Sequence, residues 1–182
     1  MNTPNLILLG ALLASSTVAG FMFYETTRSA STAEIQSADP ESQITMRPVF
    51  SLNDIDGNKR SITEWDGKAL VVNFWATWCA PCRQEIPVLM SMQEELAAQN
   101  IQFIGIAIDD PESVSEYAAK EPFNYPILVG EQEGIDAAEA FGADVVALPM
   151  TIFTDYAGRI IDVHAGEISR DEINANLKRL PR

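Results

Sequence analysis

The chain contains two cysteines, Cys79 and Cys82, separated by two residues. This spacing brings both sulfurs within bonding reach, so the pair can close into a disulfide and open again. If Cys79 starts a helix, the unpaired N–H groups and the positive end of the helix dipole stabilise its thiolate and lower its pKa. Cys79 could then attack a disulfide in another molecule, and Cys82 could resolve the mixed disulfide. The pattern therefore predicts a reversible two-electron switch.

Two other uses of the cysteines fit the sequence less well. A tetrahedral zinc site needs about four ligands, and the chain offers no further cysteine and a single histidine, His164. A purely structural disulfide across two residues would remove little entropy from the unfolded chain. We therefore expect no metal and no cofactor beyond the redox-active cysteine pair, and we interpret His164 as structural or solvated.

The residues around the cysteines predict a buried strand that leads directly into a helix. Residues 69–76 are nearly all apolar and rich in β-branched side chains, as in a strand covered on both faces. Pro81 suits the first turn of the following helix, where its missing N–H has no intrahelical partner anyway. We expect Trp75 in the core beneath the cysteines and Trp78 on the surface beside them.

The remaining pattern predicts one α/β domain with a central mixed sheet. Residues 49–62 are typical of a β-hairpin that turns at Asp56-Gly57. The final helix is predicted to begin at Ser169, with Glu172 completing a capping box. The other predicted elements are strands at 102–108, 125–129, 150–154 and 159–163 and helices at 112–120 and 134–141.

Residues 1–24 are predicted to anchor the chain in a membrane. Residues 6–24 carry no charge and, as a helix rising ~1.5 Å per residue, are long enough to cross a ~30 Å hydrocarbon core. A cleaved signal peptide is the alternative, with Thr17-Val18-Ala19 as a cleavage site. The aromatic cluster at 21–24 favours the retained anchor, because such side chains settle at the membrane interface.

Composition indicates where the linker and the folded domain lie and which class of partner the net charge disfavours. Residues 25–46 are rich in Ser, Thr, Ala and acidic residues without an apolar period, which predicts a flexible linker ahead of a domain over 47–182. The net charge of −14 repels phosphate backbones. Nucleic acid is therefore not an expected partner.

The segment VVNFWATWCAPCRQEIP, residues 71–87, resembles the active-site segment of the membrane-tethered thioredoxin-like family that includes TlpA, ResA and the CcmG/DsbE proteins. Residues 105–119, the insertion at 125–141 and the proline loop with its hairpin at 147–161 resemble that family in the same order. The resemblance extends over about residues 49–180. It implies a thioredoxin fold, with a mixed sheet flanked by helices, an N-terminal hairpin and an inserted α/β segment.

The resemblance also implies roles for single residues. Cys79 matches the attacking cysteine and Cys82 the resolving one. Pro149 matches a cis proline that faces the cysteines, and X–Pro bonds are the ones for which the cis form costs little. Leu148 would then offer its backbone to the substrate.

The position of Asn73 departs from cytosolic thioredoxins, which have there a buried aspartate that takes the proton of the resolving thiol. Asparagine cannot take that proton. The family resemblance offers Glu85 instead, one helical turn after the second cysteine, and burial would raise its pKa toward neutrality. Trp78, Ala80 and Pro81 complete the surface expected to contact substrate.

The family resemblance implies an extracytoplasmic thiol–disulfide oxidoreductase that reduces exported proteins, such as apocytochrome c or a factor of copper-protein assembly. A membrane thiol–disulfide transporter would resupply its electrons. The Ala80-Pro81 pair is closer to the Gly-Pro of reducing thioredoxins than to the Pro-His of the oxidant DsbA. The alternatives are a disulfide oxidant or isomerase, a copper chaperone like the Sco proteins, although these use C-x-x-x-C, and a peroxidase, although its Pro-x-x-x-Thr-x-x-Cys pattern is missing.

Overall fold

The computed structural model describes residues 46–142 and 147–181, which belong to a unit spanning Ile44–Arg182. The predicted anchor over residues 1–24, its alternative cleavage site and all of the predicted linker except Met46 lie outside the described residues. Within the part of the chain that is described, no helix is both long and apolar enough to span a bilayer.

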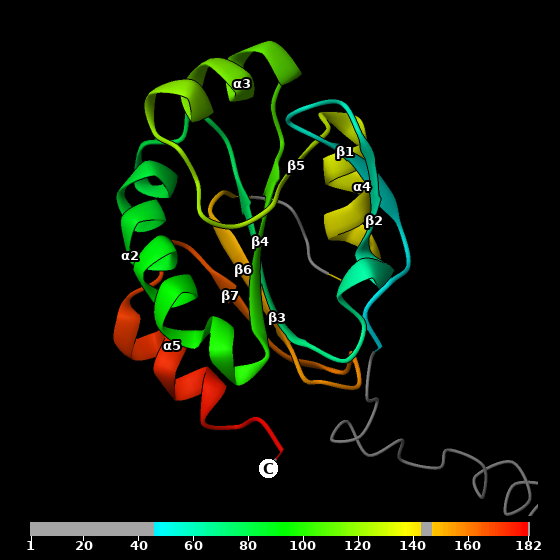
Figure 1. Ribbon diagram of the computed structural model, residues 1–182, viewed down its shortest axis with the longest axis vertical. Helices are drawn as coiled ribbons and strands as arrows, with labels where there is room; N and C mark the ends of the chain where they lie inside the picture. Colours follow the sequence, from blue (N-terminus) through cyan, green and yellow to red (C-terminus); the bar gives the residue numbers. More distant parts are fainter. Residues whose placement is uncertain (1–45, 143–146, 182) are drawn as a thin grey trace, which may run out of the picture. The chain divides into compact units, whose positions relative to one another are not determined.

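The described strands form one mixed sheet in the order β2-β1-β5-β4-β3-β6-β7 (Figure 1). The central strand β3 runs parallel to β4, and β4 runs parallel to β5, whereas β6 lies antiparallel to β3 on its other side. The mixed sheet expected from the sequence is thus confirmed. The strands are β1 (Ser51–Asp54), β2 (Lys59–Ser61), β3 (Ala69–Trp75), β4 (Ile101–Ala107), β5 (Ile127–Val129), β6 (Met150–Thr154) and β7 (Ile160–Ala165).

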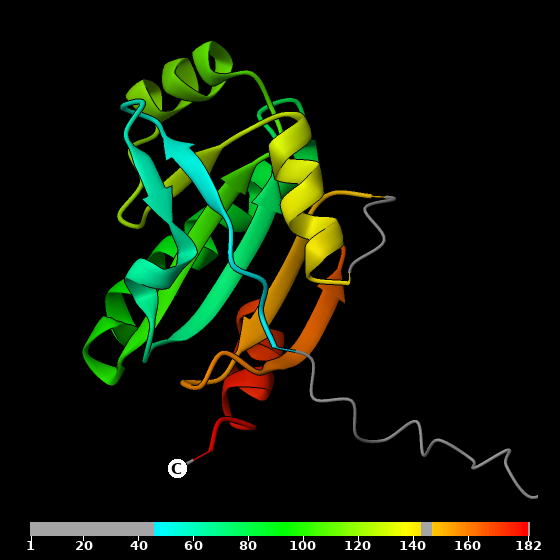
Figure 2. The ribbon, with the colours of Figure 1, turned by 90° about the vertical axis from the view of Figure 1, so that its right-hand side faces the viewer.

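Helices cover both faces of the sheet (Figures 1 and 2). Side chains of α2 and α5 pack with the odd-numbered apolar residues of β3, and side chains of α4 pack with the even-numbered ones. Every residue of β3 is buried, which explains its unbroken apolar sequence. The helices are α2 (Ala80–Leu96), α3 (Pro111–Lys120), α4 (Gln132–Ala140) and α5 (Arg170–Leu177), with 3₁₀ turns η1 (Ile62–Trp65) and η2 (Ala97–Gln99).

Most element ends agree with the sequence prediction to within two residues. The strand predicted from residue 125 begins at Ile127, because Pro126 has no N–H for a ladder bond. The helix predicted from residue 134 begins two residues earlier, at Gln132. The capping box at the start of α5 is confirmed, since Ser169 and Glu172 bond to each other's backbone N–H groups.

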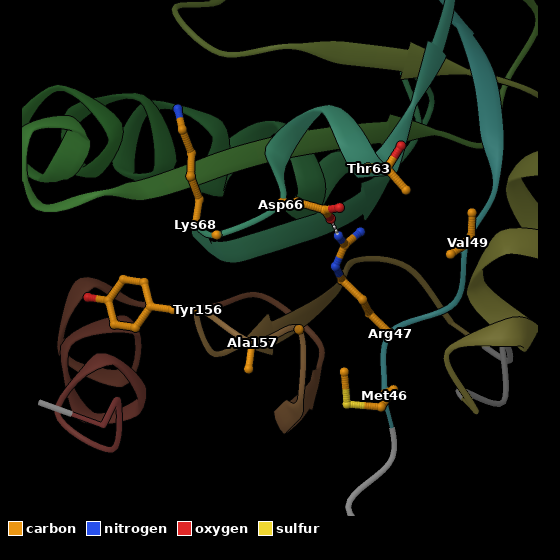
Figure 3. A pocket seen from close by; sticks show the side chains of 10 residues that line it. Met46, Arg47, Val49, Thr63, Asp66, Lys68, Tyr156 and Ala157 are labelled. Atoms are coloured by element: carbon orange, nitrogen blue, oxygen red, sulfur yellow. Dashed lines mark hydrogen bonds and ion pairs between the residues drawn. The ribbon is translucent and has the colours of Figure 1, made fainter.

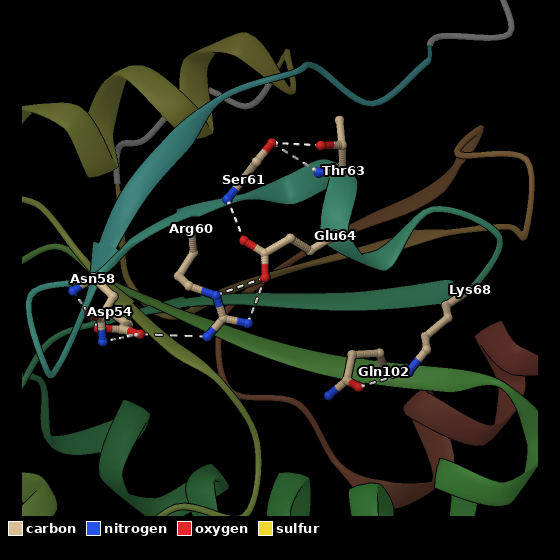
Figure 4. Close-up of polar contacts among 8 residues, drawn as sticks. All are labelled: Asp54, Asn58, Arg60, Ser61, Thr63, Glu64, Lys68 and Gln102. Atoms are coloured by element: carbon tan, nitrogen blue, oxygen red, sulfur yellow. Dashed lines mark hydrogen bonds and ion pairs between the residues drawn. The ribbon is translucent and has the colours of Figure 1, made fainter.

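The predicted N-terminal hairpin is also confirmed, and ion pairs of Arg60 link its two strands to each other and to the following 3₁₀ turn. Gly57 sits in the turn with a φ of 80°, a conformation that glycine adopts without strain. The Arg60 guanidinium lies between two carboxylates, 2.7 Å from Glu64 and 3.5 Å from Asp54 (Figure 4). These contacts fix β1 and β2 to the 3₁₀ turn that leads into β3.

Arg47 secures the first described residues to the domain. Its backbone N–H donates to the Gly158 carbonyl at 2.8 Å, and its guanidinium bonds the Ile62 carbonyl at 3.1 Å and pairs with Asp66. Figure 3 shows the Arg47 and Asp66 side chains pointing toward each other in a pocket. The chain therefore enters the domain beside the β6–β7 turn.

Candidate functional site

The two cysteines lie where β3 ends and α2 begins, as the sequence predicts. Cys79 is the N-cap of α2, and its sulfur accepts a hydrogen bond from the Cys82 N–H at 3.3 Å. The pair forms a disulfide with a Cα–Cα distance of 5.3 Å. Cys79 is 5% exposed and Cys82 is fully buried, so an incoming thiolate or disulfide can approach Cys79 alone. In the reduced protein the same helix end would stabilise a Cys79 thiolate.

The predicted contact residues surround the disulfide on its solvent side. Trp78 is 68% exposed, and Ala80 and Pro81 are exposed as well. Trp75 is buried, as expected. A large exposed aromatic ring beside a redox centre offers apolar contact area to a protein substrate.

Aromatic side chains from α3 and from the segment between α3 and β5 support the core beneath the cysteines. The Trp75 ring packs against Tyr117 of α3 at 5.4 Å and against Phe123 at 5.3 Å between ring centroids. Tyr125, which precedes β5, packs against Phe123 at 5.5 Å. Burial raises the pKa of Tyr125 well above the ordinary value, and the nearby Glu85 carboxylate raises it further. The phenol therefore stays neutral at physiological pH.

A buried carboxylate that the sequence analysis did not identify fixes the turn before Cys79. One oxygen of Asp109 accepts the Thr77 N–H at 2.8 Å and the Thr77 hydroxyl at 2.6 Å. The other oxygen accepts the Asp110 N–H at 2.9 Å. The acidic pair after β4 was the available signal, but the sequence alone did not show that one member would turn back toward Thr77.

The proline loop leads into β6, whose first residue, Met150, pairs with Phe74 near the end of β3. The Leu148–Pro149 peptide bond is cis, as the family resemblance implied, and Pro149 is buried. Leu148 is half-buried and packs against the core cluster that includes both cysteines.

Glu85 lies one turn after Cys82 in α2 and is 1% exposed. Its Oε2 accepts a hydrogen bond from the Ile168 N–H at 2.8 Å, and its Oε1 accepts one from Nδ2 of Asn73 at 2.7 Å. Burial raises the pKa of Glu85 from 4.5 to about 7, and the negative charge of Glu167 adds to the rise, while the two hydrogen bonds oppose it. A carboxyl with this pKa can take or give a proton near neutral pH.

A single loop between β7 and α5 contacts both the cis proline and this carboxylate. The Gly166 N–H donates to the Pro149 carbonyl at 2.8 Å, and two residues later the Ile168 N–H donates to Glu85. The fold thus gathers Cys79, Cys82, Pro149 and Glu85 around the start of α2.

His164 lies on β7, half-buried, with Nε2 3.3 Å from the Glu167 carbonyl oxygen. Over residues 46–142 and 147–181, no group of three or more His, Cys, Asp or Glu side chains is placed to hold a metal ion.

Comparison with known proteins agrees with this geometry. The AhpC/TSA family model matches residues 45–163. The thioredoxin-like protein YneN of Bacillus subtilis (strain 168) is 35% identical over 134 residues, which are 71% of this chain and 75% of YneN. The thiol-disulfide oxidoreductase ResA of Geobacillus thermodenitrificans is 28% identical over 132 residues, covering 72% of this chain and 74% of ResA.

Among solved structures, a thiol:disulfide interchange protein of the thioredoxin family from Chlorobium tepidum TLS superimposes with a TM-score of 0.68. It is 31% identical in sequence, and the match covers 76% of this chain and 97% of that one. Together with the C-x-x-C pair at the start of α2, these matches show that the chain belongs to the AhpC/TSA family and is a thioredoxin-like thiol–disulfide oxidoreductase of the ResA and YneN kind.

Proposed function

We propose that this enzyme reduces disulfide bonds in exported proteins at the outer face of a bacterial cytoplasmic membrane, to which residues 1–24 anchor it. The observation that carries the proposal is the buried Glu85 carboxylate one helical turn behind Cys82. A reductant must deprotonate its second thiol during each cycle, and we assign that step to this carboxyl because its raised pKa of about 7 lets it accept a proton near neutral pH.

The reaction starts from the reduced pair. The Cys79 thiolate attacks one sulfur of the client disulfide, which forms a mixed disulfide and releases the client's other sulfur as a thiolate. Cys82 then loses its proton to Glu85 and attacks Cys79, which releases the client's second thiolate. The enzyme ends with the Cys79–Cys82 disulfide, and the client gains two electrons and takes up two protons.

The surface beside Cys79 would position the client. Trp78, Ala80 and Pro81 lie exposed around it, and Leu148 offers its backbone next to the cis proline. An extended client segment paired with this backbone would bring its disulfide onto Cys79, because main-chain hydrogen bonds to an exposed backbone edge align a peptide.

Two partners follow from the resemblance to the TlpA, ResA and CcmG proteins. A membrane thiol–disulfide transporter would reduce the Cys79–Cys82 disulfide after each cycle. The clients would be the heme-binding cysteines of apocytochrome c or a factor of copper-protein assembly.

The reduction potential of the Cys79–Cys82 couple tests the direction of electron flow. The full-length protein in a mild detergent would be equilibrated with dithiothreitol and glutathione buffers. A potential near or below about −230 mV, with thioredoxin near about −270 mV and DsbA near about −120 mV, supports a reductant. A potential near that of DsbA would identify an oxidant or isomerase instead.

A trapping experiment tests the clients. Cys82→Ser leaves the attacking cysteine without a resolving partner, so mixed disulfides with clients should accumulate on Cys79. The matched control, Cys79→Ser, retains one thiol but should trap nothing, because that thiol is buried. Equal trapping by both variants would contradict the assigned order of attack.

A further inference from the structure

We propose that Asn73 is a positioning residue whose side-chain amide turns over when Glu85 gains or loses its proton. This inference rests on the proposed role of Glu85 as the proton acceptor for Cys82, and it adds the group that adapts to that proton.

The sheet places Asn73 directly under the Glu85 carboxylate. Asn73 of β3 and Thr151 of β6 are paired neighbours across the two strands, and both side chains are buried. Nδ2 of Asn73 donates to Oε1 of Glu85 at 2.7 Å and to the Thr151 hydroxyl oxygen at 3.0 Å. Oδ1 of Asn73 is buried and has no hydrogen-bond partner within the described part of the chain. The amide therefore makes both of its contacts through its nitrogen.

This arrangement suits an ionised Glu85, because the Asn73 amide and the Ile168 N–H each donate to one oxygen of the carboxylate. A protonated Glu85 has an O–H that must itself find an acceptor. The Ile168 backbone N–H can only donate, so Oε2 must remain an acceptor. The proton then belongs on Oε1, where it would face the N–H of Asn73, and two donors would meet at a heavy-atom separation of 2.7 Å.

Turning the Asn73 amide by 180° resolves this conflict. Oδ1 would then occupy the present place of Nδ2 and accept the Glu85 proton, and the Thr151 hydroxyl would rotate to donate to the same oxygen. The amide oxygen and nitrogen have nearly the same size, so the turn needs no repacking. In the present orientation Oδ1 of Asn73 lacks a partner, and in the turned orientation Nδ2 would lack one. Each orientation thus leaves one buried amide atom unpaired, so the protonation state of Glu85 decides which is favoured.

The groups that face Glu85 determine when this change happens. On its own helix lies the Cys79–Cys82 pair, which carries no charge as a disulfide. Glu167 approaches from the β7–α5 loop, and Tyr125 approaches from the segment before β5. On β7, His164 is the cross-strand partner of Thr151, and its Nε2 lies 3.3 Å from the Glu167 carbonyl oxygen. No cation pairs with the Glu85 carboxyl within the described residues, so burial and the donors of Asn73 and Ile168 act against each other, and the carboxyl titrates in the neutral range.

The proposed turnover matters for the reduction step. When Cys82 passes its proton to Glu85, the new O–H needs an acceptor at once, since a buried donor without a hydrogen-bond partner is costly. Asn73 supplies that acceptor by turning, and it supplies a donor again when Glu85 releases the proton. An apolar residue at position 73 could do neither.

The test follows the side-chain amide directly. Full-length oxidised protein in a mild detergent, labelled with ¹⁵N in asparagine and ¹³C at the glutamate carboxyl, would be titrated from about pH 5 to pH 9 by NMR. We expect the Asn73 NH₂ signals and the Glu85 carboxyl signal to change with one shared midpoint. Asn73 signals that stay constant while Glu85 titrates would overturn the proposal.

Glu85→Gln provides a second, independent measurement. Its amide resembles the protonated acid, with one acceptor oxygen for Ile168 and one donor toward Asn73. The Asn73 signals in this variant should therefore match the low-pH form of the wild type and ignore pH. Signals that match the high-pH form would also overturn the proposal.

Thr151→Val serves as a near-isosteric comparison. Without the hydroxyl, Asn73 loses one hydrogen bond in either orientation, the one that Nδ2 donates now and the one that Oδ1 would accept after turning. The Asn73 and Glu85 signals should therefore still change with one shared midpoint, and midpoints that separate would overturn the proposal. Because these titrations use the oxidised protein, they succeed or fail independently of whether the enzyme reduces exported clients.

Discussion

Replacing Glu85 with glutamine should remove a large pH dependence from the stability of the oxidised protein. The carboxyl has a pKa of 4.5 when exposed and about 7 in the folded protein. Between these values the unfolded chain releases the proton while the folded protein keeps it, so the free energy of unfolding falls as pH rises from about 4.5 to about 7. Below this window both states are protonated, and above it both are ionised.

The size of the effect follows from the same two values. At 1.36 kcal/mol per pKa unit, the full loss is about 3 kcal/mol. Between pH 5 and pH 8 the wild type should lose about 2–3 kcal/mol relative to Glu85→Gln, because glutamine does not ionise. A loss of this size is a large fraction of the stability of an ordinary domain.

Urea unfolding followed by tryptophan fluorescence would measure this difference on the full-length oxidised protein at both pH values. Glu94→Gln is the matched control, since Glu94 lies exposed on the same helix and its replacement makes the same change in net charge. The control should follow the wild type. Parallel stability curves for the wild type and Glu85→Gln would refute the conclusion that burial governs this carboxyl.

Three further predictions concern the scaffold around the site. Gly105→Ala would place a Cβ 2.6 Å from Cδ1 of Ile127, so overpacking should cost about 1–3 kcal/mol in urea unfolding; an unchanged midpoint would show that this side chain moves aside freely. Ser169→Ala removes the N-cap of α5 and should cost about 1 kcal/mol, whereas Ser169→Asp should restore most of it. Asp109→Ala removes the carboxylate oxygen that accepts both hydrogen bonds from Thr77 and should speed hydrogen exchange of the Thr77 amide at least tenfold, while amides of β3 exchange as before.

The sequence predicted those parts of the fold that depend on local pattern. The apolar run at 69–76 forms strand β3 over Ala69–Trp75, and the two cysteines lie at the start of α2 because the strand ends just before them and Pro81 favours a first helical turn. The cap at Ser169 likewise needs only residues a few positions apart. Such features follow from short-range spacing.

The contacts that the sequence did not reveal join residues far apart in the chain. Thr77 and Asp109 are 32 positions apart, Asn73 and Thr151 are 78 apart, and Glu85 and Ile168 are 83 apart. These pairs depend on strand order and register, which no single segment encodes. In the last pair the donor is the backbone N–H of Ile168, so the residue type at position 168 does not indicate the contact.

The residue types at positions 73 and 85 depend on each other. Nδ2 of Asn73 and Oε1 of Glu85 are 2.7 Å apart, so an aspartate at position 73 would place two buried carboxylates in contact. Two such groups cannot both ionise readily, so one of them would hold a proton well above its ordinary pKa. An amide at position 73 avoids that repulsion and can still donate or accept. Cytosolic thioredoxins carry the buried acid on the strand, whereas this chain carries it on the helix as Glu85. Asn73 is therefore a partner that leaves a single buried carboxyl, with a pKa of about 7, to exchange its proton near neutral pH.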